Sequence, residues 1–181
     1  MVKMTDPDAE AMLIERRIEQ VLLKYTRAAD RFDVAGMRSC YWPGAVDWHG
    51  DFRGSVEEFI PWVERRLSDF DRTMHHLTNI TIEVADSRDV ARVESYLIAF
   101  HRFEGSEGDP VEVYLGLRYV DRFEARAGEW RIAARVCSYE WKREISGRDP
   151  GFGSSHVLGS RGADDALHWI MDLEPEYPHR G

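Results

Sequence analysis

Two adjacent histidines, His75 and His76, lie in the stretch 71–80, directly before the alternating run 80–84, which is typical of a strand. A neutral imidazole is the side chain best suited to proton transfer near neutral pH, and one held where a strand begins can be aimed into a pocket. Taken alone, the pair is more readily explained as surface or hydrogen-bonded core histidines. Other residues of the chain favour a chemical role, and we take His75 as the candidate centre.

The composition is that of a globular protein and excludes a nucleic-acid partner. The chain has 181 residues, of which 43% are hydrophobic and 12% are aromatic, enough for one domain with a sizeable core and an aromatic-lined pocket. Its formal net charge is -9, which repels phosphate backbones and leaves no basic stripe. We therefore expect neither DNA nor RNA as a partner.

Cysteine usage and the N-terminal residues favour a cytoplasmic protein. Cys40 and Cys137 are too few and too far apart to indicate a disulfide framework or a zinc knuckle, so we expect two buried thiols. Residues 1–8 lack the apolar core of a signal peptide, and no later run approaches the length of a membrane span. We expect a cytoplasmic location and no membrane partner.

The first part of the chain predicts helices. A helix begins near Thr5, with Pro7 in its first turn, and its apolar stripe carries Tyr25 inward before the pattern weakens at Asp30. Asp33 opens a second short helix, and a capping-box pattern at 55–58 opens a third that runs to Leu67. A short strand over 45–50 and a strand fragment near 52–53 lie between the second and third helices.

The second part of the chain predicts an antiparallel sheet. Strands are expected over 79–84, 90–103, 111–123 and 129–141, separated by short turns. Helices followed by strands indicate an α+β fold in which a curved sheet wraps the N-terminal helices. Residues 1–144 form this domain in our interpretation, and the glycine-rich residues 145–181 form a C-terminal extension: a loop or arm with a short helix over 164–173.

Four residues together resemble a known family. Tyr25 and Asp30 at the end of the first helix, His75 in the sequence His-His-Leu-Thr-Asn, and Arg135 in the last strand resemble the SnoaL-like branch of the nuclear transport factor superfamily, over roughly residues 11–141. This resemblance implies a cystatin-like fold, a cone with an internal pocket. Within the branch the chain is similar to scytalone dehydratase, bile-acid 7α-dehydratase and hexachlorocyclohexane dehydrochlorinase, which use an Asp-His pair in that pocket.

The resemblance implies roles for individual residues. Asp30 corresponds to the carboxylate of the pair and His75 to the base. Tyr25 corresponds to the pocket phenol of the bile-acid enzyme, which favours loss of water over loss of chloride, and Arg135 corresponds to an arginine that lines the pocket. His101 lies near the position of a second histidine in scytalone dehydratase, and its strand could place it in the pocket or on the opposite face. Trp48 and Tyr114 are further candidate substrate-binding residues because of their aromatic side chains.

The chemistry of elimination requires the same residue types. A base must take a carbon-bound proton while another group assists the leaving group, and an apolar pocket strengthens both interactions. Asp30 would fix the tautomer of His75 and stabilise its imidazolium form, while Tyr25 or Arg135 would polarise a carbonyl or assist the departing hydroxyl. We therefore predict a cofactor-independent lyase that acts on a bulky, mainly apolar hydroxylated ring.

Three alternatives remain open at this stage. A non-catalytic ligand-binding or accessory subunit would share the fold, and an isomerase or polyketide cyclase would use similar proton transfer. A metal site built from His49, His75, His76 and His101 is disfavoured, because adjacent strand residues point to opposite faces. We thus expect no metal and no cofactor. A curved sheet with one exposed face favours a homo-oligomer, and we expect a trimer rather than a dimer.

Overall fold

The chain folds into two compact units, residues 1–148 and 149–181. The computed structural model describes residues 7–106, 108–147, 151–161 and 165–170. The first unit contains three helices and a six-stranded sheet. No helix in these ranges combines the length and the apolar character needed to cross a bilayer.

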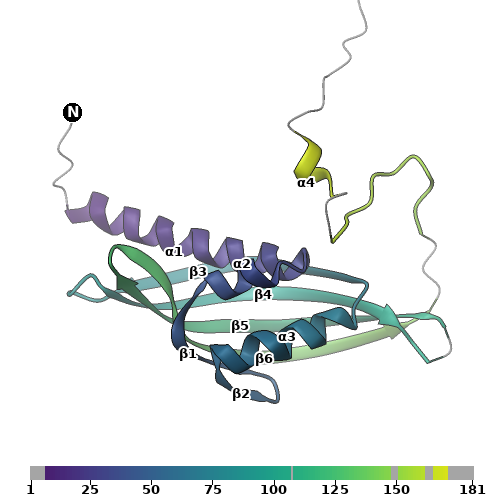
Figure 1. Cartoon of the computed structure of the whole chain (residues 1–181), viewed down its shortest axis with the longest axis horizontal. Coiled ribbons are helices and arrows are strands. Elements are labelled where there is room, and N and C mark those ends of the chain that lie inside the picture. Colours follow the sequence, from purple (N-terminus) through teal and green to yellow (C-terminus); the bar gives the residue numbers. More distant parts are fainter. Residues whose placement is uncertain (1–6, 107, 148–150, 162–164, 171–181) are drawn as a thin grey trace, which may run out of the picture. The chain divides into compact units, whose positions relative to one another are not determined.

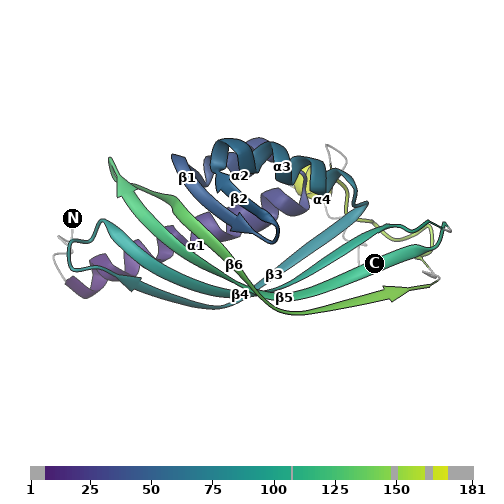
Figure 2. The ribbon, with the colours of Figure 1, turned by 90° about the horizontal axis from the view of Figure 1, so that it is seen from below.

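The three helices of the first unit lie on the concave side of the sheet, as Figure 2 shows. They are α1 (Pro7–Asp30), α2 (Val34–Ser39) and α3 (Val56–Ser68). The side chain of Asp33 caps α2 by accepting a hydrogen bond from the backbone N–H of Gly36 at 2.8 Å. Both predicted helix starts, at Asp33 and at the capping box of Ser55 and Glu58, are confirmed. The expected cap at Thr5 lies outside the described residues.

The sheet is curved and open, and Figure 1 shows its long strands β3 to β6 running side by side. Its strands are β1 (Tyr41–His49), β2 (Phe52–Ser55), β3 (Arg72–Val84), β4 (Val90–Glu104), β5 (Pro110–Arg126) and β6 (Glu129–Ser146). The spatial order is β2-β1-β6-β5-β4-β3, and the expected antiparallel meander covers β3 to β6. The chain then departs from a pure meander, since β1 pairs with β6 in parallel. The α+β class with a curved sheet and N-terminal helices is confirmed.

Of the six strands, β3 and β6 extend furthest beyond the sequence prediction. β3 begins at Arg72, so His75 lies within a strand and not at its entrance. β6 continues to Ser146, although we expected irregular structure from Ile145. Both extensions pair along most of their length with long neighbouring strands, and this pairing overrides the weak local pattern.

A β-bulge at Asn79 sets which side chains of β3 face the helices. Residues Thr78 and Ile80 pair with consecutive residues of β4, so Asn79 is the extra residue. Before the bulge, odd-numbered residues such as His75 and Leu77 point inward, whereas after it the even-numbered Ile80 does so. Asn79 has φ of 42°, a left-handed conformation that asparagine tolerates better than most residues. The bulge therefore lets the histidine and the later apolar run share one face.

A second bulge acts in the same way on β6. Ala134 and Ile132 pair with the consecutive residues Arg122 and Phe123, which leaves Ala133 as the extra residue. Strict alternation from Trp130 and Ile132 would turn Arg135 outward, but the bulge turns Arg135 into the core.

The core lies between α1, α3 and the concave face of the sheet. On α1, Ile14, Ile18, Leu22 and Tyr25 are buried, with the spacing of one helical stripe. Cys40 and Cys137 are buried free thiols, as expected.

The second unit contains one short described helix, α4 (Ala166–Trp169). The helix that the sequence predicts over 164–173 extends into positions 164 and 171–173, which lie outside the described residues. Within this unit the Asp165 carboxylate accepts a hydrogen bond from the backbone N–H of Ser160 at 2.9 Å.

Asn79 can be tested by substitution. We expect Asn79→Val to lower the free energy of unfolding by about 2 kcal/mol, because a β-branched side chain is disfavoured at positive φ. Asn79→Gly should stay within about 1 kcal/mol of the wild type, since glycine adopts this conformation freely. Urea denaturation measures both, with Thr81→Val on the regular part of β3 as the matched control. Equal stability of the Asn79→Val variant and the control would contradict the role given to the bulge.

Candidate functional site

A cavity of about 770 Å³ lies in the first unit between α1, α3 and the sheet. One part of its wall is apolar and aromatic, and includes Trp62, Leu67, Phe70, Phe103 and Leu115. A second set of lining residues carries groups that can donate or accept a proton: Tyr25, His49, His75, His101, Tyr119 and Tyr139. A largely apolar cavity with a few polar groups is the usual form of a small-molecule site.

The Asp30 carboxylate holds His75 at two points. Its Oδ1 lies 2.7 Å from His75 Nδ1, and its Oδ2 accepts a hydrogen bond from the His75 backbone N–H at 2.9 Å. Asp30 is the last residue of α1 and His75 lies on β3, so these contacts fix the helix end to the strand. Because Nδ1 is engaged by the carboxylate, Nε2 is the ring nitrogen available to a molecule in the cavity.

Asp30 is in its charged form at neutral pH. Burial raises the pKa of this carboxyl group, but the hydrogen bonds and charge of His75, together with the Thr73 hydroxyl, outweigh burial and hold the pKa below its ordinary value of 3.8. An ionised carboxylate accepts a hydrogen bond and cannot donate one, so the proton between the two groups belongs to His75 Nδ1.

His101, which the sequence could place in the pocket or on the opposite face, lines the cavity. Its ring centroid lies 5.4 Å from that of His75, and the two rings are almost perpendicular. Residues Thr73 and His101 are cross-strand partners, and His75 follows two positions along β3 on the same face. The cavity thus has two neighbouring imidazoles.

Tyr25 also lines the cavity and is otherwise buried, with 2% of its surface exposed. Burial raises the pKa of its phenol, and the nearby Arg135 guanidinium offsets only part of this effect. Tyr25 is therefore protonated at neutral pH and can act as a hydrogen-bond donor.

Arg135 does not line the cavity, which corrects the expectation from sequence. Its guanidinium is fully buried and pairs with Asp121, from Nε to Oδ1 and from Nη2 to Oδ2, both at 2.7 Å. The Tyr119 and Tyr25 rings lie over the guanidinium, with centroids at 3.8 and 4.5 Å from Cζ. Burial lowers the pKa of Arg135, but the Asp121 carboxylate outweighs it and keeps the pKa well above the ordinary value. Arg135 therefore contacts two residues of the cavity wall, Tyr25 and Tyr119, without lining the cavity itself. Its ion-pair partner is Asp121 and not Asp30.

Trp48 and Tyr114 are also placed away from the cavity, contrary to the substrate-binding role expected for them. Trp48 is 46% exposed, and the Arg53 guanidinium stacks on it at 4.7 Å. Tyr114 packs against Phe100 and donates a hydrogen bond to Glu112. Each alternates with residues that point inward, so both belong to the outer face of the sheet.

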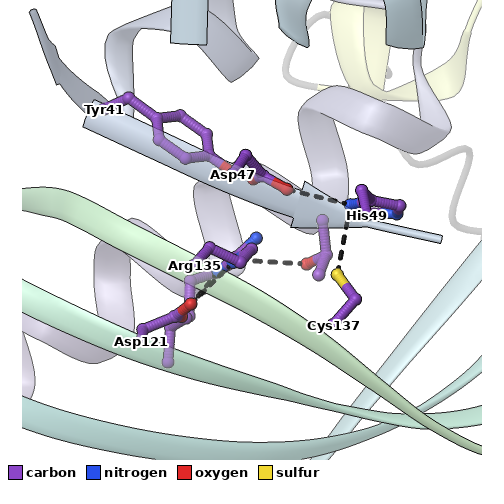
Figure 3. Close-up of polar contacts among 8 residues, drawn as sticks. Tyr41, Asp47, His49, Asp121, Arg135 and Cys137 are labelled. Carbon is purple, nitrogen blue, oxygen red and sulfur yellow. Dashed lines mark hydrogen bonds and ion pairs between the residues drawn. The ribbon is translucent and has the colours of Figure 1, made fainter. Parts of the chain in front are cut away.

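Sequence reasoning did not single out a second polar cluster at the cavity. Figure 3 shows Asp47 and His49 of β1 close to Cys137 of β6. Burial and the Asp47 charge raise the pKa of the Cys137 thiol, and Arg135 opposes this only in part. The signal in the sequence was the spacing of Asp47 and His49 on one face of a strand. The parallel pairing of β1 with β6, which brings in Cys137, left no such signal.

Several solved structures share this fold. A protein from Novosphingobium aromaticivorans that is provisionally assigned as a scytalone dehydratase is 19% identical, with a TM-score of 0.67 over 80% of this chain and 97% of the other. A type 2 hexachlorocyclohexane dehydrochlorinase is 15% identical, with a TM-score of 0.69 over 80% and 99%. A protein of unknown function from Mycobacterium tuberculosis is 20% identical, with a TM-score of 0.62 over 76% and 78%. No curated protein matches the chain in sequence.

The fold and the cavity define an α+β protein of the cystatin-like class, suited to a catalytic or ligand-binding role. A family model for the SnoaL-like domain matches residues 10–136. The chain belongs to the SnoaL-like family of the nuclear transport factor superfamily.

The structural role of Arg135 can be tested by removing the charges singly and together. We expect Arg135→Met to lower the free energy of unfolding by about 3–5 kcal/mol, because Asp121 is then buried without a partner. The double variant Arg135→Met with Asp121→Asn should recover much of this loss. Arg92→Met, at an exposed pair with Glu83, is the matched control and should change stability by less than about 1 kcal/mol. Urea denaturation that gave the same small change for Arg135→Met and the control would contradict this role.

Proposed function

We propose that this protein is a cofactor-independent lyase that removes water from a bulky, mainly apolar hydroxylated ring compound. The observation that carries the proposal is the two-point contact of Asp30 with His75 at the wall of the cavity. A carboxylate that holds one ring nitrogen of a histidine increases the basicity of the other nitrogen, as in other carboxylate-imidazole pairs.

The proposed elimination is a proton transfer coupled to the loss of a hydroxyl group. His75 Nε2 takes the proton from a carbon next to the one that bears the hydroxyl. The electrons of that C–H bond form the new C=C bond, and the C–O bond breaks. Asp30 stabilises the imidazolium that forms. The leaving oxygen must receive a proton to depart as water, and Tyr25 and His101 are the donors that we propose for this step.

The cavity wall favours a ring compound as substrate. Its aromatic and aliphatic side chains suit an apolar skeleton such as a steroid-like, terpenoid or polyketide-derived ring. One structural neighbour is named as a scytalone dehydratase and another as a hexachlorocyclohexane dehydrochlorinase. Both names describe elimination reactions, the loss of water and the loss of HCl. These similarities support the reaction type without identifying the substrate.

Two other functions remain alternatives. An isomerase or polyketide cyclase would use the same proton transfer at His75 without loss of water. A non-catalytic ligand-binding subunit would use the cavity alone. The paired imidazoles favour a catalytic role over ligand binding alone, because proton transfer uses an acid as well as a base.

We also propose a homo-oligomer, with a trimer preferred to a dimer. The outer face of the sheet carries several exposed apolar side chains, a composition that favours contact with another copy. They include Val46, Trp48, Met74, Ile98 and Val136.

The adjacent histidines provide a matched pair of variants for the proposed reaction. Mass spectrometry would follow the loss of water from a panel of polycyclic compounds that carry a hydroxyl group next to an acidic C–H bond. We expect His75→Ala and Asp30→Asn to slow turnover by at least about 100-fold. The first substitution removes the base, and the second removes the charge that stabilises the imidazolium form of the base. His76→Ala should keep the wild-type rate, since His76 is an exposed neighbour on the other face of β3.

Three outcomes would count against the proposal. Wild-type protein that binds members of the panel without changing them would favour the ligand-binding alternative. Rearrangement without loss of water would favour the isomerase or cyclase. Equal rates for the His75→Ala and His76→Ala variants, with folding confirmed by circular dichroism, would exclude His75 as the base.

A further inference from the structure

Three side-chain atoms that can each bind a metal ion, an oxygen, a nitrogen and a sulfur, lie close together beside the cavity. His49 Nδ1 lies 3.1 Å from Cys137 Sγ and 3.4 Å from Asp47 Oδ1, and Figure 3 shows both contacts as dashed lines. The three atoms all lie within 4.8 Å of one another. Asp47 and His49 come from β1 and Cys137 from the parallel strand β6, where Trp48 pairs with Val136.

The geometry differs from that of a nucleophilic triad. In a carboxylate-histidine-nucleophile relay, the carboxylate and the nucleophile contact different ring nitrogens, so that a proton can pass across the ring. Here Asp47 and Cys137 both approach Nδ1 of His49. An arrangement in which oxygen, nitrogen and sulfur converge is instead that of ligands around a metal ion.

The carboxylate of Asp47 is oriented and incompletely satisfied. Its Oδ2 accepts a hydrogen bond from the Tyr41 hydroxyl at 2.6 Å, whereas its Oδ1 has no hydrogen-bond partner among the described residues. The residue is fully buried. Arg135, the cross-strand partner of Asp47 on β6, pairs with Asp121 through Nε and Nη2, and its buried Nη1 makes no hydrogen bond to a described residue. A buried carboxylate oxygen without a partner is costly, and a bound cation beside it would remove this cost.

We propose that Asp47, His49 and Cys137 form a binding site for a divalent transition-metal ion, with Zn²⁺ as the best match. Imidazole, thiolate and carboxylate are the three ligand types that Zn²⁺ takes in proteins. Two ligand atoms at a tetrahedral angle around Zn²⁺ lie about 3.3–3.6 Å apart, close to the 3.1 and 3.4 Å that separate His49 Nδ1 from Cys137 Sγ and Asp47 Oδ1. The two positive charges of the ion balance the Asp47 carboxylate and a Cys137 thiolate.

The hydrogen bond from Tyr41 is part of this site. It fixes the orientation of the Asp47 carboxylate and leaves Oδ1 for the ion, as the outer partners of metal ligands do. His49 lines the cavity, so the ion would bind beside the space that the substrate is proposed to fill. The site shares no residue with the Asp30-His75 pair, and it stands or falls independently of the proposed function.

Titration of chelator-treated protein with Co²⁺ tests the site, because Co²⁺ replaces Zn²⁺ and is visible by absorption. We expect one equivalent to produce a thiolate-to-cobalt charge-transfer band in the near ultraviolet, and Zn²⁺ to abolish it. His49→Ala and Asp47→Asn should weaken Co²⁺ binding at least about tenfold, since each removes one ligand. Cys137→Ser should lose the charge-transfer band.

The second cysteine provides the matched control. Cys40 is also a buried thiol, but its Sγ donates to the backbone carbonyl of Gly36, so Cys40→Ser should keep the band. Asp30→Asn should keep it as well. Circular dichroism would establish that each variant is folded. Folded wild-type protein that gives no thiolate band in excess Co²⁺ would overturn the proposal. A band that persists in Cys137→Ser, or unchanged Co²⁺ affinity in His49→Ala and Asp47→Asn, would overturn it too.

Discussion

The contact between the Asp30 carboxylate and His75 is the interaction on which the architecture of the cavity depends. One oxygen engages the ring and the other engages the backbone, so the end of α1 and the middle of β3 are held in a fixed relation. The same contact has a chemical consequence, because an ionised carboxylate at Nδ1 leaves Nε2 unprotonated in the neutral imidazole. Structure and proposed chemistry thus rest on one pair of side chains, and the loss of either would affect both.

The wall of the cavity that contains Tyr25 and Tyr119 depends on a buried ion pair. Arg135 and Asp121 form a bidentate contact under the rings of Tyr25 and Tyr119, which themselves line the cavity. A pair of this kind adds little net stability compared with apolar residues, but it is costly to break. It therefore fixes the positions of the two phenols. Arg135 is also the cross-strand partner of Asp47, the buried carboxylate on the neighbouring strand β1.

Much of the fold could be predicted from sequence, whereas the site could be predicted only in part. The caps at Asp33 and Ser55 and the strand periodicities are local signals, and they gave the helices and the meander. The bulges at Asn79 and Ala133 reverse the face of the residues that follow, so alternation alone could not place Arg135. Trp48 was assigned to the pocket for its aromatic character, although its neighbours Asp47 and His49 are the inward residues. Cys137 joins them through a parallel pairing between distant strands, which no local pattern encodes.

The tautomer of His75 is the property that tests the account most directly. Long-range ¹H–¹⁵N correlation spectroscopy of protein labelled with ¹⁵N at histidine distinguishes the two ring nitrogens, and His75→Gln and His101→Gln variants would assign the signals. At a pH where the ring is neutral, we expect the proton on Nδ1 and a bare Nε2, and we expect Asp30→Asn to weaken this preference. A neutral His75 that carries its proton on Nε2 would contradict the account, because its free nitrogen would then face Asp30 and could not act as a base in the cavity.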